Sequence, residues 1–350
     1  MNAPADLIRL TQFSHGGGCG CKIAPAVLSE ILAKTPVRGL PEDLLVGIES
    51  SDDAAVYRLN DEQAIVATTD FFTPIVDDPR DFGRIAAANA LSDVYAMGGK
   101  PIFALAIVGM PLDKMPVEVI QRIIAGGESV CAQAGIPVAG GHSIDTLEPI
   151  YGLVAIGLVH PKKVKRNDRA KAGDALILGK PLGVGILSAA LKKGKLSASG
   201  YKQMVEVTTQ LNTPGTALAE MEDVHALTDV TGFGLAGHLL EICRGSKLGA
   251  EVRFDDLPIL PEALEWVKEG TATGASDRNW KGYGHEVRMP AGSPDWMRKL
   301  ISDPQTSGGL LVACAPEAEK RVIEEFRRQG FSLACRIGAM RAGAPALAVT

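Results

Sequence analysis

The sequence predicts an α/β protein built from two domains. Short apolar segments with strand character alternate with segments of helical period, and this alternation is typical of an α/β layer. The length of 350 residues suits about two domains of ordinary size. A hydrophobic share of 46% and a charged share of 22% are ordinary for a globular protein that buries a sizeable core.

The first half of the chain predicts helices set between short strands. Apolar runs bounded by turn residues predict strands at 44–47, 54–57, 64–69, 102–108, near 138 and at 150–159. The strongest helix covers 84–97, with Asp81 as its N-cap and two glycines directly after it. Further helices are expected at 116–135 and 26–33.

The second half repeats the mixture of strand and helix. Strands are expected at 175–178, 226–228, 251–254, 310–313 and 333–337. Helices are expected at 183–192, in segments up to 221, at 235–243 and at 317–329. The stretch 271–293 is rich in glycine, polar and aromatic residues, and it reads as a long loop.

A basic stretch at 161–173 separates the two halves. It has six lysines and arginines and no apolar period, so we expect a solvated surface connection, with an anion site as the lesser alternative. We therefore divide the chain into an N-terminal segment at 1–47, an N-terminal domain at 48–160 and a C-terminal domain at 161–350.

Composition narrows the functional class. The net charge of −5 argues against broad binding to nucleic acid or to an anionic membrane. No run of 18 apolar residues and no apolar leader is found in the sequence, so we expect a cytoplasmic protein. Six cysteines are too few for a disulfide scaffold. Apolar surroundings predict small buried side chains at Cys131, Cys243, Cys314 and Cys335.

The segment Ser14–Lys22 (SHGGGCGCK) differs from all other parts of the chain. Its glycines at 16, 17, 18 and 20 predict a mobile backbone, which carries Cys19, Cys21 and Lys22. A soft nucleophile and a positive charge can thus be brought onto a ligand. The alternative is a disordered terminus with incidental cysteines. A Cys-x-Cys pair without a second pair is a weak signal for a metal.

Aspartates recur at the ends of predicted elements. Asp52 and Asp53 lie between two strands, while Asp70 and Asp229 each end a strand. Asp93 shares a face with Asn89, four residues earlier on a helix that is apolar nearly all round. Buried carboxylates need a partner, and Mg²⁺ prefers such oxygen ligands together with phosphates. The set predicts Mg²⁺ held on a triphosphate, although any single Asp could instead cap a helix or fill a turn.

Two other classes of function remain open at this point. Residues 232–237 match G-x-G-x-x-G, which suggests a dinucleotide-binding oxidoreductase with Asp255 or Asp256 on the ribose. Asp229 just before that motif would repel a pyrophosphate, and no Walker-type phosphate loop occurs. A non-enzymatic carrier could hold a soft atom on Cys19 and Cys21, but it would leave the aspartates unused.

Long motifs resemble the selenophosphate synthetase family, also called selenide, water dikinases. In order from about residue 8 to 340 they are SHGGGCGCK (14–22), DDAAVY (52–57), TTDFF (68–72), DFGRIAAANALSDVYAMGG (81–99), GGHSID (140–145), TDVTGFGLAG (228–237) and DPQTSGGLL (303–311). The resemblance implies conversion of ATP, selenide and water to selenophosphate, AMP and orthophosphate with Mg²⁺. It also implies the two-domain fold of aminoimidazole ribonucleotide synthetase. A related kinase such as thiamine-monophosphate kinase is the alternative within that fold.

The resemblance also implies roles for single residues. Cys19 and Lys22 match the catalytic cysteine and the essential lysine, which also contacts nucleotide. Magnesium ligands match Asp53, Asp93 and Asp229, and an ATP contact matches Asp70. The remaining nucleotide-binding positions match Ser50, Ser51, Asp52, Asp93, Gly141, His142 and Ser143.

The same resemblance bears on assembly and phosphate binding, whereas the source of selenide stays open. The chain forms a homodimer through strands of its N-terminal domain, and the 141–143 segment is presented from the partner subunit. Ser50-Ser51 departs from the Thr-Arg of some members, which removes an arginine from phosphate binding. Selenide arrives free or from a selenium-delivery protein.

Overall fold

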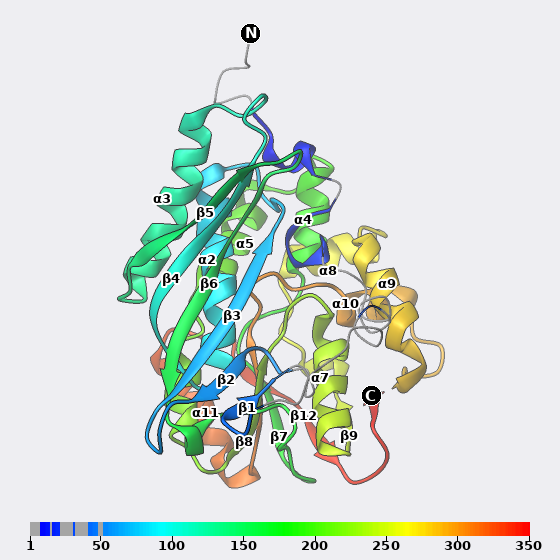
Figure 1. Ribbon diagram of the computed structural model, residues 1–350. Helices are drawn as coiled ribbons and strands as arrows, with labels where there is room; N and C mark the ends of the chain where they lie inside the picture. Colours follow the sequence, from blue (N-terminus) through cyan, green and yellow to red (C-terminus); the bar gives the residue numbers. More distant parts are fainter. Residues whose placement is uncertain (1–7, 15, 22–30, 32–40, 48–51) are drawn as a thin grey trace.

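The computed structural model describes residues 8–14, 16–21, 31, 41–47 and 52–350. The helix expected at 26–33 lies outside the described residues, apart from Ile31. Two sheets and the helices around them make up the fold (Figure 1). The mixed α/β class with two sheets is as predicted.

The N-terminal sheet has six strands in the order β1-β2-β3-β6-β4-β5. Only β4 and β5 pair in parallel. Its strands are β1 (Leu44–Val46), β2 (Ala55–Arg58), β3 (Ala64–Phe72), β4 (Lys100–Met110), β5 (Val138–Asp145) and β6 (Ile150–Val159). Helices α2 (Pro79–Ala96) and α3 (Val117–Gln133) pack together. A Cβ on Gly83 would lie 1.8 Å from the Ile123 carbonyl oxygen, so glycine lets these helices approach closely.

The C-terminal sheet has seven strands in the order β10-β13-β9-β12-β7-β11-β8. These are β7 (Ala175–Leu178), β8 (Val224–Asp229), β9 (Gly249–Val252), β10 (Val287–Arg288), β11 (Leu310–Cys314), β12 (Cys335–Arg341) and β13 (Ala346–Val349). Its helices are α4 (Val184–Lys192), α5 (Ala198–Thr209), α6 (Pro214–Ala219), α7 (Gly234–Ser246), α8 (Pro261–Lys268), α9 (Gly274–Tyr283), α10 (Asp295–Ile301) and α11 (Glu319–Arg328).

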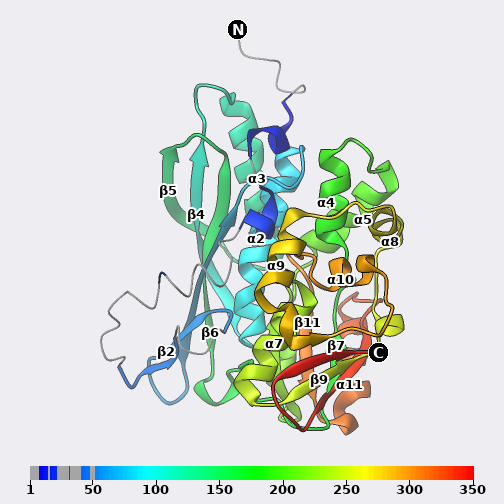
Figure 2. The ribbon, with the colours of Figure 1, turned by 90° about the vertical axis from the view of Figure 1, so that its right-hand side faces the viewer.

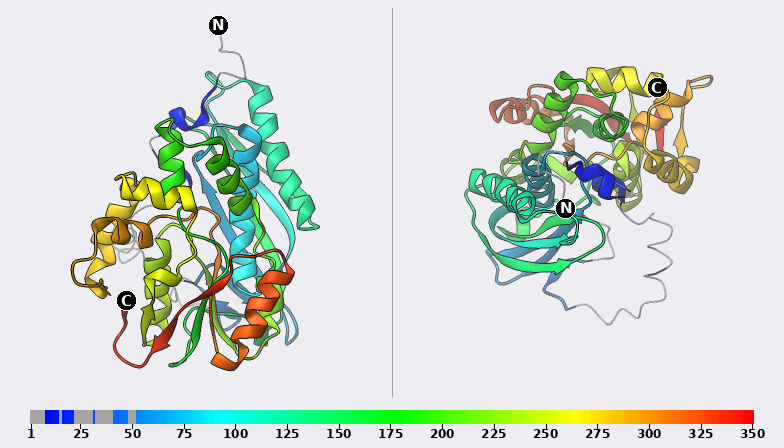
Figure 3. Two further views of the ribbon diagram at one scale, coloured as in Figure 1. Left: turned by 180° about the vertical axis from the view of Figure 1, so that it is seen from behind. Right: turned by 90° about the horizontal axis from the view of Figure 1, so that it is seen from above.

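Helix α2 lies between the two domains. It contacts β3 and β6 of the N-terminal sheet, and α5, α6 and β8 of the C-terminal domain. Figure 2 shows α2 standing between the N-terminal strands and the C-terminal helices, and Figure 3 shows the two domains side by side from above. All residues of 85–96 are buried, as the apolar sequence of this helix predicts. Polar side chains on α2 therefore meet polar groups from both domains.

Two expectations about the elements are wrong. Asp78 caps α2, not Asp81, because Pro79 occupies the first helical position and the Asp78 carboxylate accepts from the Asp81 amide at 2.9 Å. The stretch 271–293 contains α9 and β10 instead of a loop. The last expected strand begins at Cys335, and β13 follows it.

Tertiary contacts explain the helix within 271–293. The Thr273 hydroxyl caps α9 by accepting from the Ser276 amide at 3.2 Å. Asn279 donates to the carbonyls of Gly232 at 2.9 Å and Ser302 at 3.1 Å. These bonds compensate for a composition that favours helix weakly. The short helices α8 and α10 were also not expected.

The basic connection 161–173 is only partly exposed, contrary to expectation. Lys165 is buried and donates to the carbonyls of Met221 at 2.8 Å and Val224 at 2.7 Å. Asn167 is also buried. The connection therefore ties the two domains together. The division at 1–47, 48–160 and 161–350 stays a prediction.

The cysteine expectations hold at three of four positions. Cys131, Cys243 and Cys314 are fully buried, and burial raises the pKa of each thiol. Cys335 is only half-buried, and its Sγ lies 3.5 Å from the Asp256 carbonyl. Among the described residues, no helix is long and apolar enough to cross a membrane.

Candidate active site

One face of β3 supplies the first part of the site. Side chains alternate along a strand, and the even-numbered residues of β3 point toward α2 while its odd-numbered residues are more exposed. Thr68 and Asp70 share the inner face. Thr68 donates to the Asp93 carboxylate, and the Asn89 amide donates to Asp70 Oδ2 at 2.6 Å. The predicted i,i+4 pair on α2 thus meets β3.

Residues at the end of β8 are the contribution of the C-terminal domain to the site. The Ser92 hydroxyl of α2 donates to the Asp229 carboxylate, and Asn212 donates to Ser92 Oγ at 2.7 Å. Thr228 donates to Asp53 Oδ1 at 2.8 Å. Thr228 and Asp53 lie 175 residues apart in the sequence, so these hydroxyl groups hold carboxylates from distant segments of the chain.

Asp53, Asp93 and Asp229, the three expected metal ligands, are close enough for Asp93 and Asp229 to affect the ionisation of Asp53. Burial raises the pKa of Asp53 well above its usual range, and the negative charges of Asp229 and Asp93 raise it further. The bond from Thr228 acts in the opposite direction. The three carboxylates repel one another, and no cationic side chain is among the causes of the pKa shift of Asp53. A cation bound here would relieve that repulsion.

The carboxylates fit a hard cation only in part. Asp53 Oδ2 is buried and accepts no hydrogen bond from any described residue, so a lone pair stays free for a ligand. In the described part of the chain, however, no three acidic, histidine or cysteine side chains already stand as a metal-holding group. The carboxylate oxygens still have the chemistry that Mg²⁺ prefers, because phosphate oxygens of a substrate can complete its coordination shell.

Cys19 is 1% exposed and contacts Asn89, which lies one helical turn before Asp93 on α2. Its Sγ donates to Asn89 Oδ1 at 3.2 Å, and its amide donates to Thr306 Oγ1 at 3.0 Å. Asn89 Oδ1 also accepts from the Ser307 amide at 2.7 Å. Asn89 thus links the thiol to Asp70 and to the 303–311 motif.

The glycine-rich segment is docked in its described part, although its composition predicts mobility. Gly18–Cys21 forms a 3₁₀ turn, and the Gly18 amide donates to the Thr73 carbonyl at 2.8 Å. Gly18 has a φ of +53°, and a Cβ there would lie 2.3 Å from both Ile75 Cγ2 and Thr306 Oγ1. Glycine at this position is therefore required for Cys19 to dock.

Sequence reasoning missed the groups that hold the 306–309 turn. Lys180 is buried and donates to the carbonyls of Gln210 at 2.7 Å and Ser307 at 2.9 Å. Burial lowers the pKa of Lys180 to about 7, and the charge of Asp229 opposes this shift. Asn212 donates to the Gly308 carbonyl at 2.8 Å. The only signal in the sequence was the DPQTSGGLL motif, which had no residue role attached.

Asp52 lies beside a different group from Asp53. Its Oδ1 accepts from the Asn167 amide at 2.8 Å, and its Oδ2 lies 3.8 Å from Arg166 Nε. It therefore binds the connection between the domains, and its predicted nucleotide contact stays a prediction. Lys22, Ser50 and Ser51 lie outside the described residues.

The segment Gly141–Ser143 is not at the Cys19 site in a single chain. Along one rung of the sheet, Asp70 pairs with Leu153, Leu153 with Ala106, and Ala106 with Gly141. Three strand spacings separate Asp70 from Gly141, which is about 14 Å. All three residues of the segment are exposed on the edge strand β5.

The C-terminal sheet does not have the strand arrangement of a dinucleotide-binding fold. Helix α7 does follow β8 through the 232–237 motif, but β8 is an edge strand that pairs only with β11, in antiparallel orientation. A dinucleotide fold needs parallel neighbours around that turn.

Two family models match the chain. AIR synthase related protein, N-terminal domain, matches residues 51–159, and the corresponding C-terminal domain matches residues 171–348. A selenide, water dikinase of Burkholderia pseudomallei is 67% identical over 336 residues, which cover 96% of this chain and 95% of the relative. That of Dechloromonas aromatica is 63% identical over 346 residues and covers 99% of both chains. The chain belongs to the selenide, water dikinase family.

Membership of the selenide, water dikinase family makes the chain an ATP-using enzyme that forms selenophosphate, which confirms the predicted function. Solved structures agree on the fold. Thiamine-monophosphate kinase from Stenotrophomonas maltophilia has a TM-score of 0.63 at 22% identity, and covers 93% of this chain and 95% of its own. A HypE–HypF complex chain has a TM-score of 0.68 at 17% identity, and covers 93% and 96%. At 22% and 17% identity, these two structures show the fold alone. The alternative of a thiamine-monophosphate kinase is therefore not favoured over a selenide, water dikinase.

Proposed function

We propose that the Asn89-centred site carries the reaction ATP + selenide + H₂O → selenophosphate + AMP + orthophosphate. The observation that supports it most directly is the contact of Cys19 with Asn89, because Asn89 in turn binds Asp70. A thiol and a polyphosphate site are thus joined by one side chain. Asp53 interacts electrostatically with Asp93 and Asp229, and α2, which carries Asp93, contacts both domains.

Asp53, Asp93 and Asp229 would hold Mg²⁺. When bound, Mg²⁺ supplies positive charge to phosphate oxygens, and this lowers the repulsion between ATP and an anionic attacker. The free Oδ2 of Asp53 supports this assignment, together with the repulsion that raises the pKa of that carboxyl. Thr68, Ser92 and Thr228 orient the three carboxylates by donating to them.

Cys19 holds or steers selenium beside the γ-phosphate, and Lys22 brings positive charge to the transferred group. Asp70 contacts ATP, with Ser50, Ser51 and Asp52 contributing to the same phosphate region. The burial of Cys19 supports a closed site, because both phosphoryl-releasing steps require control of water.

A homodimer would complete the nucleotide site. Gly141 lies about 14 Å from Asp70 within one chain, by the strand spacing. We therefore assign the 141–143 segment to the site of a second copy. The edge strand β5 is exposed on both faces. Ile144 and Leu147 beside that segment are 53% and 85% exposed, which suits an interface between two copies.

Selenide reaches the site free or from a selenium-delivery protein, and the enzyme works in the cytoplasm. None of the six cysteines, all within the described residues, forms a disulfide, which suits a reducing compartment. No role is assigned to nucleic acid or to a membrane surface.

Paired cysteine variants test the proposal. Cys19→Ser removes the nucleophile, so selenide-dependent AMP release and the P–Se signal in phosphorus NMR should be lost. Cys21→Ser is the matched control on the same turn, and its activity should stay close to that of the parent. ADP as the end product would indicate an ordinary kinase. Full selenophosphate formation by Cys19→Ser would contradict the role given to the thiol.

A further inference from the structure

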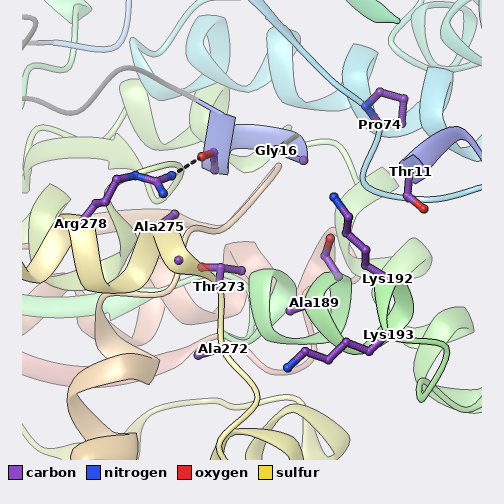
Figure 4. A pocket seen from close by; sticks show the side chains of 14 residues that line it. Thr11, Gly16, Pro74, Ala189, Lys192, Lys193, Ala272, Thr273, Ala275 and Arg278 are labelled. Atoms are coloured by element: carbon purple, nitrogen blue, oxygen red, sulfur yellow. Dashed lines mark hydrogen bonds between the residues drawn. The ribbon is translucent and has the colours of Figure 1, made fainter. Parts of the chain in front are cut away.

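A pocket with three cationic side chains lies behind the Cys19 turn. Its volume is about 320 Å³. The C-terminal end of α4 forms one wall, the N-terminal end of α9 another, and the glycine-rich segment a third. Figure 4 shows Lys192 and Lys193 on one side of this pocket and Arg278 on the opposite side.

The lining of the pocket suits an anion. Of the described residues that line it, none is acidic and none is aromatic. Lys192, Lys193 and Arg278 make no ion pair within the described chain, whereas the net charge of the whole protein is −5. The partial positive charge at the N-terminus of α9 is offset by the partial negative charge at the C-terminus of α4, so the three cationic side chains set the charge of the pocket. Cations are therefore disfavoured there, and a nucleobase would find no ring to stack on.

Two of the three cationic groups also fasten the glycine-rich segment. Lys192 Nζ donates to the Ser14 carbonyl at 3.0 Å, and Arg278 Nη2 donates to the Gly20 carbonyl at 3.0 Å. These two carbonyls lie on either side of Cys19 in the sequence. An anion is a stronger acceptor than a neutral carbonyl, so an occupant of the pocket would compete for both donors.

We propose that this pocket binds a compact anion of the reaction, and that its occupancy releases the Cys19 segment from its docked position. The inference rests on the proposed function, because it takes Cys19 as the group that must move. Selenide on its way in and phosphate or selenophosphate on its way out share the required chemistry. Binding and release are coupled, so each favours the other.

Direct binding tests the first half of the proposal. Inorganic phosphate is titrated into the protein by calorimetry, at constant ionic strength set with chloride. The double variant Lys192→Met/Lys193→Met should bind phosphate at least tenfold more weakly. Lys202→Met/Lys195→Met is the matched control, because both side chains lie outside the pocket lining and the net charge changes equally. Equal phosphate affinity in the two double variants would overturn the proposal.

Thiol labelling tests the second half. Alkylation of Cys19, followed by mass spectrometry of its peptide, reports release without any need for ATP turnover. Phosphate should speed this alkylation severalfold in the parent, while Arg278→Met should be fast with or without phosphate. A rate that phosphate does not change in the parent would overturn the coupling. If labelling responds as expected but no AMP forms from ATP and selenide, the proposed function fails while the anion site stands.

Steady-state kinetics separates the two sources of the anion. A raised KM for selenide in Lys193→Met, with kcat unchanged, assigns the pocket to the incoming anion. Loss of product inhibition by phosphate assigns it to the outgoing one. If neither quantity changes, the pocket does not serve the reaction and the proposal is wrong.

Discussion

Gly18→Ala provides a sharp test of the docked thiol. The glycine has a φ of +53°, which costs a residue with a Cβ about 1–2 kcal/mol. The new methyl would lie 2.3 Å from Thr306 Oγ1, so that hydroxyl would have to move. It would then lose its bond to the Cys19 amide, which contributes about 1 kcal/mol.

These two costs amount to about 2–3 kcal/mol against docking. Since 1.4 kcal/mol is a factor of ten, the docked population should fall relative to the open one by about 30-fold to 100-fold. The assay is the alkylation rate of Cys19, read from its peptide by mass spectrometry, with global stability checked by thermal unfolding. We expect faster labelling in proportion, and an almost unchanged midpoint because the strain is confined to the docking of this segment.

Gly20→Ala is the matched control for this experiment. A Cβ on Gly20 would lie 3.6 Å from the nearest atoms, Ala275 Cβ and Pro304 Cγ, which is ordinary contact. Its labelling rate should stay within about twofold of the parent, because no strain of the kind at Gly18 arises. If Cys19 in Gly18→Ala is as protected as in Gly20→Ala, the docked geometry described above is wrong.

Three further changes test other parts of the structure. The pKa of Asp53 is raised above its ordinary 3.8, so the folded protein loses stability as pH rises above that value. In EDTA at pH 8, Asp53→Asn should therefore unfold at a higher temperature than the parent. Added Mg²⁺ should stabilise only the parent. Lys180 has a pKa lowered from its ordinary 10.5 to about 7, so the parent should lose stability as pH falls from about 10 to about 7, and the slope should vanish below that range. Lys180→Met should lack this slope in urea unfolding, and a parallel slope in both proteins would contradict the burial of that charge. Ile144→Glu with Leu147→Glu should give a monomer by light scattering, while Leu333→Glu, at a 54% exposed position in the other domain, should not; a dimer in both would place the interface elsewhere.

The sequence could predict those parts of the site that depend on local spacing. Asn89 and Asp93 are four residues apart on one helix, so their shared face follows from helical geometry alone. Thr68 and Asp70 likewise share a face because a strand has a period of two. The end of β8 at Asp229 was marked by an apolar run followed by a carboxylate.

Contacts between distant segments could not be predicted in the same way. Cys19 is buried because its amide meets Thr306, 287 residues away, and no local pattern indicates that pairing. The glycines of the Ser14–Lys22 segment predict a mobile backbone, because glycine has more conformational freedom than other residues. At Gly18 the same lack of a Cβ serves the opposite purpose, since it permits a close fit. The N-cap of α2 was misassigned because Asp78 and Asp81 are chemically equal, and only Pro79 distinguishes them.

The position of Asn89 bears on how the thiol works. Its Nδ2 donates to the Asp70 carboxylate and its Oδ1 accepts from the Ser307 amide, so both ends of the amide group are fixed by partners. Cys19 Sγ contacts that Oδ1, which is an acceptor, so the contact requires a proton on sulfur. A thiolate is the form that attacks or binds a soft atom. In the docked turn Cys19 thus contacts Asn89 as a thiol. The proposed release of the segment would separate the sulfur from Asn89 and expose it. The cationic pocket behind the turn offers a physical cause for that step, because an anion arriving there competes for the two donors that hold the segment down.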